Sequence, residues 1–378
     1  PPFFRRLPSP ARQFPPGPLL DPTDKVEEEK LAWYSKDNFF PVKIGDIFHT
    51  KYQVVGKLGY GGYSTVWLCR DLEEDVYFTL KLYERDSTHA EREIKVYEHL
   101  KGLKSCHTGT VLVRTVLDKF QLSSTDGSHF YQYLVHPPLG ISLFELRNRC
   151  PRKVFPEDLL KPTIIHILLT LDFLHTEAHV VHTDIQEKNI MLNIEDESIL
   201  IDFEQAEISN PSPRKVVGDR AIYHSRKLGI PKKHGRPVLS DFGEARFRSE
   251  SGTYYDDVQP FIYRAPEILL RHLFYARDIN KRHSDSHHPT EMIAYPGSPP
   301  REMLEKSKLV NNFLIVARIG KWKGLAEIRL TSLEDIESNL EGERQENFLR
   351  FIRKILQWRP EDRPTAKELL SDPWLRSP

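Results

Sequence analysis

The hydrophobic pattern of the chain changes near residue 140, and this change constrains the fold more than any other feature. Before that point, short β-prone runs alternate with glycine-rich and acidic turns, which indicates an antiparallel sheet. The runs are Tyr52–Val55, Thr65–Cys69, Val76–Leu82, Val111–Phe120 and Phe130–Val135, with a helical segment at His89–Leu100. After that point helices dominate. We therefore expect an α+β fold in which a small β-rich lobe with one main helix precedes a larger, mostly helical lobe.

Three segments carry the helical signal of the second lobe. Leucine and isoleucine recur at three- and four-residue spacing through Pro156–His175, which predicts a largely buried helix with Pro162 in its first turn. Glu343–Leu356 has a similar pattern. Thr365–Glu368 has the sequence of a capping box and is expected to open the last helix.

Composition excludes several classes of protein. The 378 residues, 39% of them hydrophobic, can bury a large core in one large or two ordinary domains. Lys+Arg and Asp+Glu both total 54, so the chain has no net charge that would attract nucleic acid or a membrane, and we expect neither partner. We also expect a monomer. No apolar run approaches the roughly 20 residues that span a bilayer. The odd number of cysteines, 3, favours a reducing compartment, the cytoplasm or the nucleus.

Residues 1–43 precede the predicted domain. Because the first residue is Pro1 and not Met, we expect the sequence to be a fragment. Residues 1–20 contain arginines and no glutamate, as transit peptides do, but their prolines oppose the amphipathic helix that such peptides form. We interpret this region as a disordered Pro-rich leader, followed by an aromatic strap from Trp33 to Phe40.

A glycine-rich stretch lies between two of the predicted strands. Glycines let backbone N–H groups approach phosphate oxygens, so a nucleotide site is one interpretation and a plain hairpin turn is the other. A Rossmann fold is disfavoured because the helix it requires does not follow. The candidate cofactor-binding residues of this stretch are Gly59, Tyr60, Gly61, Gly62, Ser64 and Val66.

Three motifs follow in a fixed order: His182–Asn189, Asp241-Phe242-Gly243 and Ala265-Pro266-Glu267. This order places an acid near a nucleophilic hydroxyl, and an asparagine and an aspartate within reach of magnesium. From Asp46 to Leu375 the chain therefore resembles the eukaryotic protein kinase superfamily. The resemblance implies a bilobal fold and transfer of the γ-phosphoryl group of ATP to protein hydroxyls, with Mg²⁺ as cofactor.

The resemblance also implies a role for each candidate catalytic residue. Asp184 is expected to accept or orient the proton of the substrate hydroxyl, and Asn189 to bind a magnesium ion. Lys81 is expected to reach the α- and β-phosphates. Glu93 is its natural ion-pair partner, and Glu91 is the alternative.

Two Asp-Phe pairs compete for the second metal site, at Asp202 and at Asp241. We choose Asp241, because Gly243 permits the backbone turn that aims the carboxylate at the metal, whereas Glu204 would add charge there. This choice makes residues 194–237 an insertion, rich in Ser, Pro and Lys.

Leu134–Gly140 is expected to form the hinge over which adenine lies. His136 takes the gatekeeper position in this interpretation. Pro137 has no N–H and offers only its carbonyl, so Leu139 is expected to supply the N–H to adenine. The predicted boundaries are then 44–139 for the first lobe with its hinge and 140–376 for the second.

The His-Thr-Asp loop and the Gly-Tyr-Gly stretch resemble the SR-protein kinase group of serine/threonine kinases, which implies an Arg/Ser-rich protein substrate. Asp256 and Asp257 are candidates to attract such a substrate, although a solvated turn is an equal alternative. Thr183 replaces the arginine that pairs with a phosphorylated activation loop in many kinases. We therefore hypothesise activity without activation-loop phosphorylation.

The chain departs from the family pattern at three places. Gln186 replaces a lysine that lies against the γ-phosphate, and Pro260 replaces a threonine that contacts the catalytic aspartate. The Asp-x-Trp-x-x-Gly helix expected after Arg271 is missing. Either an exon is missing from this version of the chain, which we favour, or the protein is a catalytically impaired pseudokinase that acts as a scaffold.

Two further pairings belong to the second lobe. Glu267 is expected to pair with a buried arginine, Arg363, a pair that small-molecule phosphotransferases lack. His283, His287 and His288 have no fourth ligand at suitable spacing, so a solvated loop is favoured over a metal site.

Overall fold

The computed structural model describes residues 9–124, 127–218, 220–231, 233–248 and 332–377, which divide into two compact units. The first unit contains the described residues up to Leu146, together with Val180–His182 and Lys188–Phe247. The second contains Arg147–His179, Thr183–Glu187 and the described residues from Arg248 onward. The predicted insertion thus belongs to the first unit, and the predicted boundary at residues 139 and 140 describes only part of the division.

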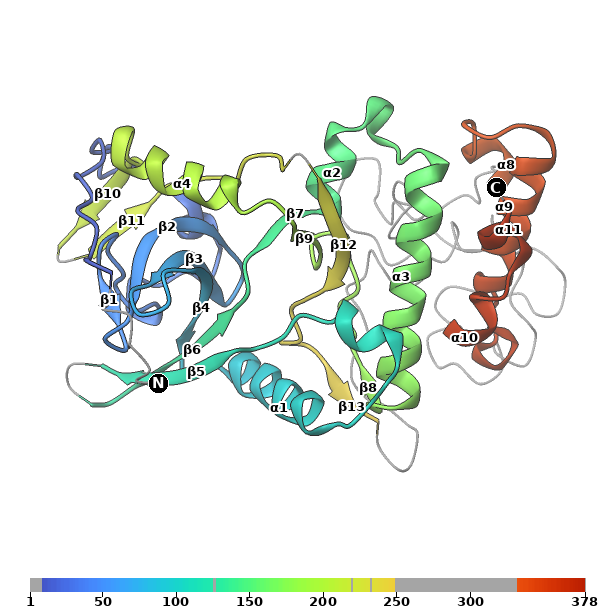
Figure 1. The fold of residues 1–378 in the computed structure, drawn as a ribbon, viewed down its shortest axis with the longest axis horizontal. Helices are drawn as coiled ribbons and strands as arrows, with labels where there is room; N and C mark the ends of the chain where they lie inside the picture. The colour runs from blue at the N-terminus through green and yellow to red at the C-terminus, as the bar shows by residue number, and fades with distance from the viewer. Residues whose placement is uncertain (1–8, 125–126, 219, 232, 249–331, 378) are drawn as a thin grey trace, which may run out of the picture. The chain divides into compact units, whose positions relative to one another are not determined.

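A six-stranded antiparallel sheet forms the base of the first unit, with the order β1-β2-β3-β4-β6-β5 (Figure 1). Its strands are β1 (Ile47–Phe48), β2 (Tyr52–Tyr60), β3 (Ser64–Asp71), β4 (Tyr77–Arg85), β5 (Asp118–Ser123) and β6 (Phe130–His136). The predicted strand at Val111–Phe120 is wrong in its first half. The His107 ring accepts a hydrogen bond from the Gly109 N–H at 2.9 Å, and the 3-10 helix η3 (Thr108–Leu112) follows.

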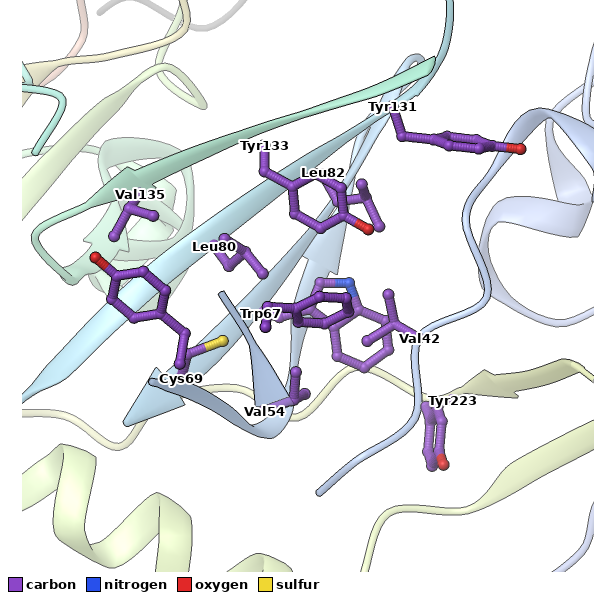
Figure 2. Packing of buried hydrophobic residues seen from close by; sticks show 12 residues of the cluster. Val42, Val54, Trp67, Cys69, Leu80, Leu82, Tyr131, Tyr133, Val135 and Tyr223 are labelled. Carbon is purple, nitrogen blue, oxygen red and sulfur yellow. The ribbon is translucent and has the colours of Figure 1, made fainter. Parts of the chain in front are cut away.

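Both faces of this sheet are buried. Because side chains alternate along a strand, neighbouring residues such as Trp67 and Leu68 belong to different apolar clusters. Figure 2 shows the cluster around Trp67, which includes Val42 from the leader and Tyr223 from the insertion. The Trp67 and Tyr223 rings meet edge to face, with centroids 5.9 Å apart.

The insertion covers the other face. It lies between β9 (Ile190–Ile194) and β12 (His234–Leu239), which pair with each other, and β9 also pairs with β7 (Leu139–Ser142). The inserted elements are α4 (Ser198–Ser209), β10 (Arg214–Val217) and β11 (Arg220–Tyr223). Helix α4 lies over β2 (Figure 1), where Ile199, Leu200 and Phe203 pack with Val55 and Leu68. Apolar packing therefore joins the insertion to the first unit.

The leader is not disordered over its described part, residues 9–43, which corrects the prediction. It contains the short 3-10 helices η1 (Glu27–Lys30) and η2 (Lys36–Asn38). Arg214 exchanges backbone hydrogen bonds with it, accepting from the Leu20 N–H and donating to the Pro18 carbonyl, both at 2.9 Å. These backbone hydrogen bonds join the leader to β10 of the insertion.

Three consecutive acids hold the leader in place. Glu28 pairs with Lys57 of β2, and both side chains are buried. Glu29 pairs with Lys215 of β10 at 2.9 Å, and Glu27 accepts a hydrogen bond from the Ser225 hydroxyl at 2.7 Å. A buried charge is tolerated only when it is paired, so these contacts fix the leader against both the sheet and the insertion.

The remaining elements of the first unit are short apart from helix α1 (Thr88–Gly102), which lies against the sheet (Figure 1). The Ser87 side chain caps α1 by accepting a hydrogen bond from the Ala90 N–H. Strand β8 (Val180–Val181) pairs with β13 (Arg246–Phe247).

The second unit is helical, as predicted. Helix α2 (Leu143–Arg149) ends in it, and α3 (Glu157–Thr176), α9 (Gly342–Ile355) and α10 (Ala366–Leu369) match the three predicted helices. Thr365 and Glu368 form the predicted capping box. The short elements are η4 (Pro151–Lys153), α8 (Leu333–Ile336), η7 (Pro360–Asp362) and α11 (Pro373–Arg376).

Helix α3 is long and apolar enough to cross a membrane by length and composition alone, but half of its apolar window is buried in the protein. It packs against α10 and α11. The buried Trp374 of α11 donates its indole N–H to Glu157 of α3 at 3.1 Å, and its ring lies 5.0 Å from that of Phe348. These contacts are typical of the core helix of a globular protein.

Candidate active site

A row of paired residues crosses the first unit and brings the predicted nucleotide residues together. Gly59 of β2 lies opposite Val66 of β3, Val66 lies opposite Lys81 of β4, and Lys81 lies opposite Leu134 of β6. Directly paired residues project from the same face of a sheet, so Val66 and Lys81 share a face. Strand pairing therefore aligns these residues without any contribution from a ligand.

Lys81 is the centre of an ion-pair cluster. Its Nζ lies 2.7 Å from Glu93 Oε2 of α1 and 3.0 Å from Asp241 Oδ1. Burial opposes the charged form of Lys81, but the carboxylates of Asp241 and Glu93 outweigh it and raise the pKa of the lysine. Lys81 is therefore a permanent cation at neutral pH.

Glu93 is the partner of Lys81, and Glu91 is exposed. The Tyr83 hydroxyl also donates a hydrogen bond to Glu93 Oε2. Tyr83 was not predicted, although it lies two residues after Lys81 and so projects from the same face of β4. Burial raises the pKa of Glu93, and the two donors hold its carboxyl group in place.

Asp241, not Asp202, is the aspartate that the structure brings to Lys81. Asp202 lies exposed on α4. Asp241 has a positive φ of 68°, and its side chain is 49% exposed. The next residue, Phe242, is buried, with its ring centroid 5.6 Å from that of Tyr97 and 4.7 Å from that of His182. The buried ring thus fixes the backbone turn that presents the carboxylate.

Asn189 lies beside Asp241 because their two strands are paired. Asn189 precedes β9, and its carbonyl accepts hydrogen bonds from the Ser240 N–H at 2.8 Å and the Ser240 hydroxyl at 2.9 Å. The Ser240 carbonyl is 3.1 Å from His182 Nε2. Burial lowers the pKa of His182 to about 4, so the ring is neutral and donates this bond. His182 is thus a structural residue.

The loop that carries Asp184 belongs to the second unit. The Gln186 amide donates hydrogen bonds to both Asp184 carboxylate oxygens, each at 2.9 Å. Glu187 is held by Arg147 of α2 in a two-point contact, with Nε to Oε1 at 2.6 Å and Nη2 to Oε2 at 2.9 Å. Thr183 is buried and has a φ of 62°, which is unusual for a β-branched residue. The sequence indicated the change to glutamine but not its contact with Asp184.

The glycine-rich stretch is a tight turn between β2 and β3, closed by a hydrogen bond from the Gly61 N–H to the Ser64 carbonyl at 2.8 Å. Among the described residues, no atom lies within 4 Å of a Cβ added at Gly59. At Gly61 the nearest atom would be 3.7 Å away. Neither residue has a positive φ. Neither backbone conformation nor packing within the described part of the chain therefore requires glycine at these positions.

Tyr60 and Ser64 flank this turn. Tyr60 is half exposed at the end of β2, and Ser64 is buried at the start of β3. The predicted hinge follows β6. Pro137 separates β6 from β7, and Leu139 is a buried residue of β7 opposite Asn193. His136 is fully buried; burial lowers its pKa well below the usual value, so its Nδ1–H donates to the Thr115 carbonyl at 2.8 Å.

The donor set fits a hard divalent cation. Asp241 offers a half-exposed carboxylate, and Asn189, whose backbone carbonyl is bonded to Ser240, carries an amide oxygen; both groups suit Mg²⁺. In the described part of the chain, no group of three or more His, Cys, Asp or Glu side chains could hold a metal ion. Mg²⁺ commonly takes its other ligands from water and substrate phosphates, so two protein ligands suffice.

Several predicted features lie outside the described residues. They are Asp256, Asp257, Pro260, the motif at residues 265–267, the missing helix after Arg271 and the histidines at 283, 287 and 288. Arg363 was predicted to be buried and is exposed, which corrects that part of the prediction, whereas its pairing with Glu267 lies outside the described residues. Its Nε donates to the Gln357 carbonyl at 2.8 Å.

Comparisons with known proteins identify the family to which the chain belongs. The protein kinase domain family matches residues 52–225. A serine/threonine protein kinase of Aspergillus fumigatus is 41% identical over 402 residues, covering 99% of this chain and 97% of that protein. SRSF protein kinase 3 of Mus musculus is 32% identical over 177 residues, covering 46% of this chain and 31% of that protein.

Two more matches extend over most of the chain. The serine/threonine-protein kinase SRPK of Physarum polycephalum is 24% identical over 416 residues, covering 95% of this chain and 93% of that protein. A crystal structure of a kinase domain superposes with a TM-score of 0.61 at 20% identity, covering 90% of this chain and all of the other. This structural match supports the fold.

Proposed function

Because the chain belongs to the serine/threonine protein kinases, we propose that it phosphorylates Arg/Ser-rich proteins and that the Lys81 cluster holds the phosphates of ATP. The family and its SRPK-like relatives indicate an active kinase, and nothing in the comparisons favours the pseudokinase alternative. The residues that carry the reaction are proposed from geometry.

The observation that carries the proposal is the position of Lys81 between two carboxylates. Glu93 fixes one side of the ammonium group at 2.7 Å, and Asp241 lies at 3.0 Å on the other. Since the lysine stays charged, it can bind the α- and β-phosphates without a change of protonation. The Glu93 contact keeps the long side chain pointed at the site, which reduces the entropy lost on binding.

Asp241 and Asn189 are proposed to hold Mg²⁺. When bound, the ion neutralises the negative charge of the phosphates. The chain's own contribution is the backbone turn at Asp241 and the Ser240 bridge to Asn189, which hold the two oxygen ligands in place before any ligand binds.

Asp184 is proposed as the catalytic residue that orients the substrate hydroxyl and accepts its proton. Gln186 supplies a neutral donor to its carboxylate, where the family pattern has a cation. Arg147 holds the same loop through Glu187. The loop is therefore tied to Arg147 through Glu187, and the Asp184 carboxylate is hydrogen-bonded by Gln186.

The glycine-rich turn and the hinge are proposed to hold the rest of the nucleotide. Since neither conformation nor the packing of residues that the structure describes requires glycine at Gly59 or Gly61, a phosphate close to the backbone is a direct reason for both. Ser64 and Val66 flank the same turn, and Leu139 and Pro137 are proposed to contact adenine.

The substrate class is proposed from similarity. SRSF protein kinase 3 is named for its substrates, and this chain is 32% identical to it over 177 residues. We propose that the protein acts as a monomer in the cytoplasm or nucleus on exposed serines flanked by arginine. A peptide of alternating arginine and serine should therefore be a better substrate than a matched lysine and serine peptide.

Radiolabelled ATP tests the proposal. Wild-type protein with Mg²⁺ should label the Arg-Ser peptide, and Asp184→Asn should reduce kcat by about 10²-fold or more. Asp241→Asn should have a similar effect, whereas Asp202→Asn, the matched control on α4, should leave the rate unchanged. Equal labelling by wild type and Asp184→Asn would contradict the proposed role of Asp184.

A further inference from the structure

The glycine-rich turn is contacted by the leader as well as by its own strands. The Trp33 indole N–H donates to the Gly62 carbonyl at 3.0 Å. The Trp33 ring also stacks on Tyr63, with centroids 6.3 Å apart and planes inclined by 26°. A Cβ added at Gly62 would lie 3.5 Å from Trp33 Cζ2, so a side chain at this position would contact the indole.

Helix α1 also contacts the turn. Tyr63 stacks on His89, with ring centroids 3.7 Å apart and planes inclined by 14°. His89 Nε2 is 2.7 Å from Glu244 Oε1, three residues after Asp241. A continuous chain of contacts thus connects Trp33, the turn, α1 and the segment that carries Asp241, all within the first unit.

Trp33 is itself held at both ends of its segment. On one side, Glu28 is fixed by its buried ion pair with Lys57. On the other, Phe39 and Val42 are buried. Both ends of the segment that carries Trp33 are therefore anchored to the first unit.

Core packing does not explain this tryptophan. Trp33 is 54% exposed and belongs to neither of the two apolar core clusters described above. An exposed aromatic residue is ordinary on a protein surface. Here, however, its single polar atom is bonded to a main-chain carbonyl of the proposed phosphate-binding turn.

We propose that Trp33 is a positioning residue for ATP, which clamps the glycine-rich turn in the conformation that receives the phosphates. The inference rests on the proposed function of that turn. Without the clamp the turn samples other conformations, and apparent affinity falls in proportion to the fraction that remains competent. Lys81, Asp241 and Asp184 are untouched, so the rate of the bound complex should not change.

Steady-state kinetics of the full chain test the clamp. Trp33→Ala should raise the KM for ATP about tenfold, since it loses one hydrogen bond and one ring contact. Trp33→Phe keeps a ring and should raise it about threefold. Both should leave kcat within about twofold. Phe130→Ala, which removes an aromatic residue 46% exposed on β6, is the matched control and should match wild type.

Hydrogen exchange provides a readout that does not depend on turnover. The Gly61 amide, bonded to the Ser64 carbonyl, should exchange faster in Trp33→Ala and Trp33→Phe than in Phe130→Ala. A wild type that transfers no phosphate would contradict the proposed function, while the exchange rates would still report on the clamp. Unchanged KM and unchanged exchange in Trp33→Phe would overturn the clamp, even if Trp33→Ala failed to fold.

Discussion

Gln186 shows how a single residue alters the chemistry expected of a loop. A lysine at this position would place a cation near the γ-phosphate, whereas the glutamine amide satisfies both oxygens of Asp184. The contact orients the carboxylate but supplies no net charge to the developing transition state. Substitution of Gln186 should therefore show how strongly kcat depends on this neutral donor.

The kcat of Gln186 variants should depend on the charge and on the hydrogen-bond donors of the new side chain. Gln186→Ala loses the orienting bond and should lower kcat about tenfold with little change in the KM for ATP. Gln186→Glu keeps the shape but adds a like charge, and should lower it further. Gln186→Lys should equal or exceed wild type. Similar kcat values for all four proteins would show that this position does not orient Asp184.

His182 gives a prediction about acid stability. Its pKa is about 4 in the folded protein and has its ordinary value of 6.5 when unfolded, so the unfolded chain binds the proton more readily. Stability is therefore lost as pH falls from about 6.5 towards 4. At pH 5 the loss from this residue is about 2 kcal/mol.

Urea unfolding at pH 7 and pH 5 measures that loss. His182→Gln retains a donor for the Ser240 carbonyl and should show a smaller decrease between the two pH values than wild type. A decrease in His182→Gln as large as that of wild type would mean that other buried groups, such as His136, dominate acid unfolding.

At the scale of elements, two positions of β2 have glycine for different physical reasons. Gly56 lies under α4, where a Cβ would be 2.7 Å from Phe203 Cε1, so the inserted helix requires glycine there. Gly59 faces open space among the described residues. Packing therefore requires glycine at position 56, whereas we assign Gly59 to ligand binding.

Alanine at these positions should separate stability from nucleotide binding. Gly56→Ala should lower the free energy of unfolding by about 1–3 kcal/mol through overpacking, and Phe203→Leu should restore part of it. Gly59→Ala should leave stability within about 0.5 kcal/mol but raise the KM for ATP. Urea unfolding and ATP titration check both. A stability loss in Gly59→Ala equal to that in Gly56→Ala would contradict this assignment.

At the scale of the whole molecule, leader and insertion complete the first unit. The leader supplies Val42 to one core cluster and a buried Glu28 to Lys57, and the insertion supplies Tyr223 and Phe203 to opposite faces of the sheet. Both segments are therefore parts of the fold, although the sequence predicted a disordered leader and only an insertion at residues 194–237.

At the scale of the whole protein, Thr183 predicts that activity does not depend on phosphorylation of the activation loop. Since no arginine stands at this position to receive a phosphorylated residue, phosphatase treatment of purified protein should leave kcat/KM within about twofold. Labelling of the Arg-Ser peptide before and after treatment measures this. Loss of activity on dephosphorylation would show that another cation receives a phosphate.

The sequence by itself determined the order of the motifs, the α3 and α9 helices and most strands, because hydrophobic period, glycine turns and capping boxes are local properties of the chain. It also favoured Asp241 over Asp202 through the glycine two residues later. Only the tertiary structure decided that Glu93 and not Glu91 reaches Lys81, that Gln186 binds Asp184 and that Trp33 lies on Gly62. These contacts depend on side-chain direction and on segments distant in sequence, such as Glu28 and Lys57, whose pairing only packing brings about.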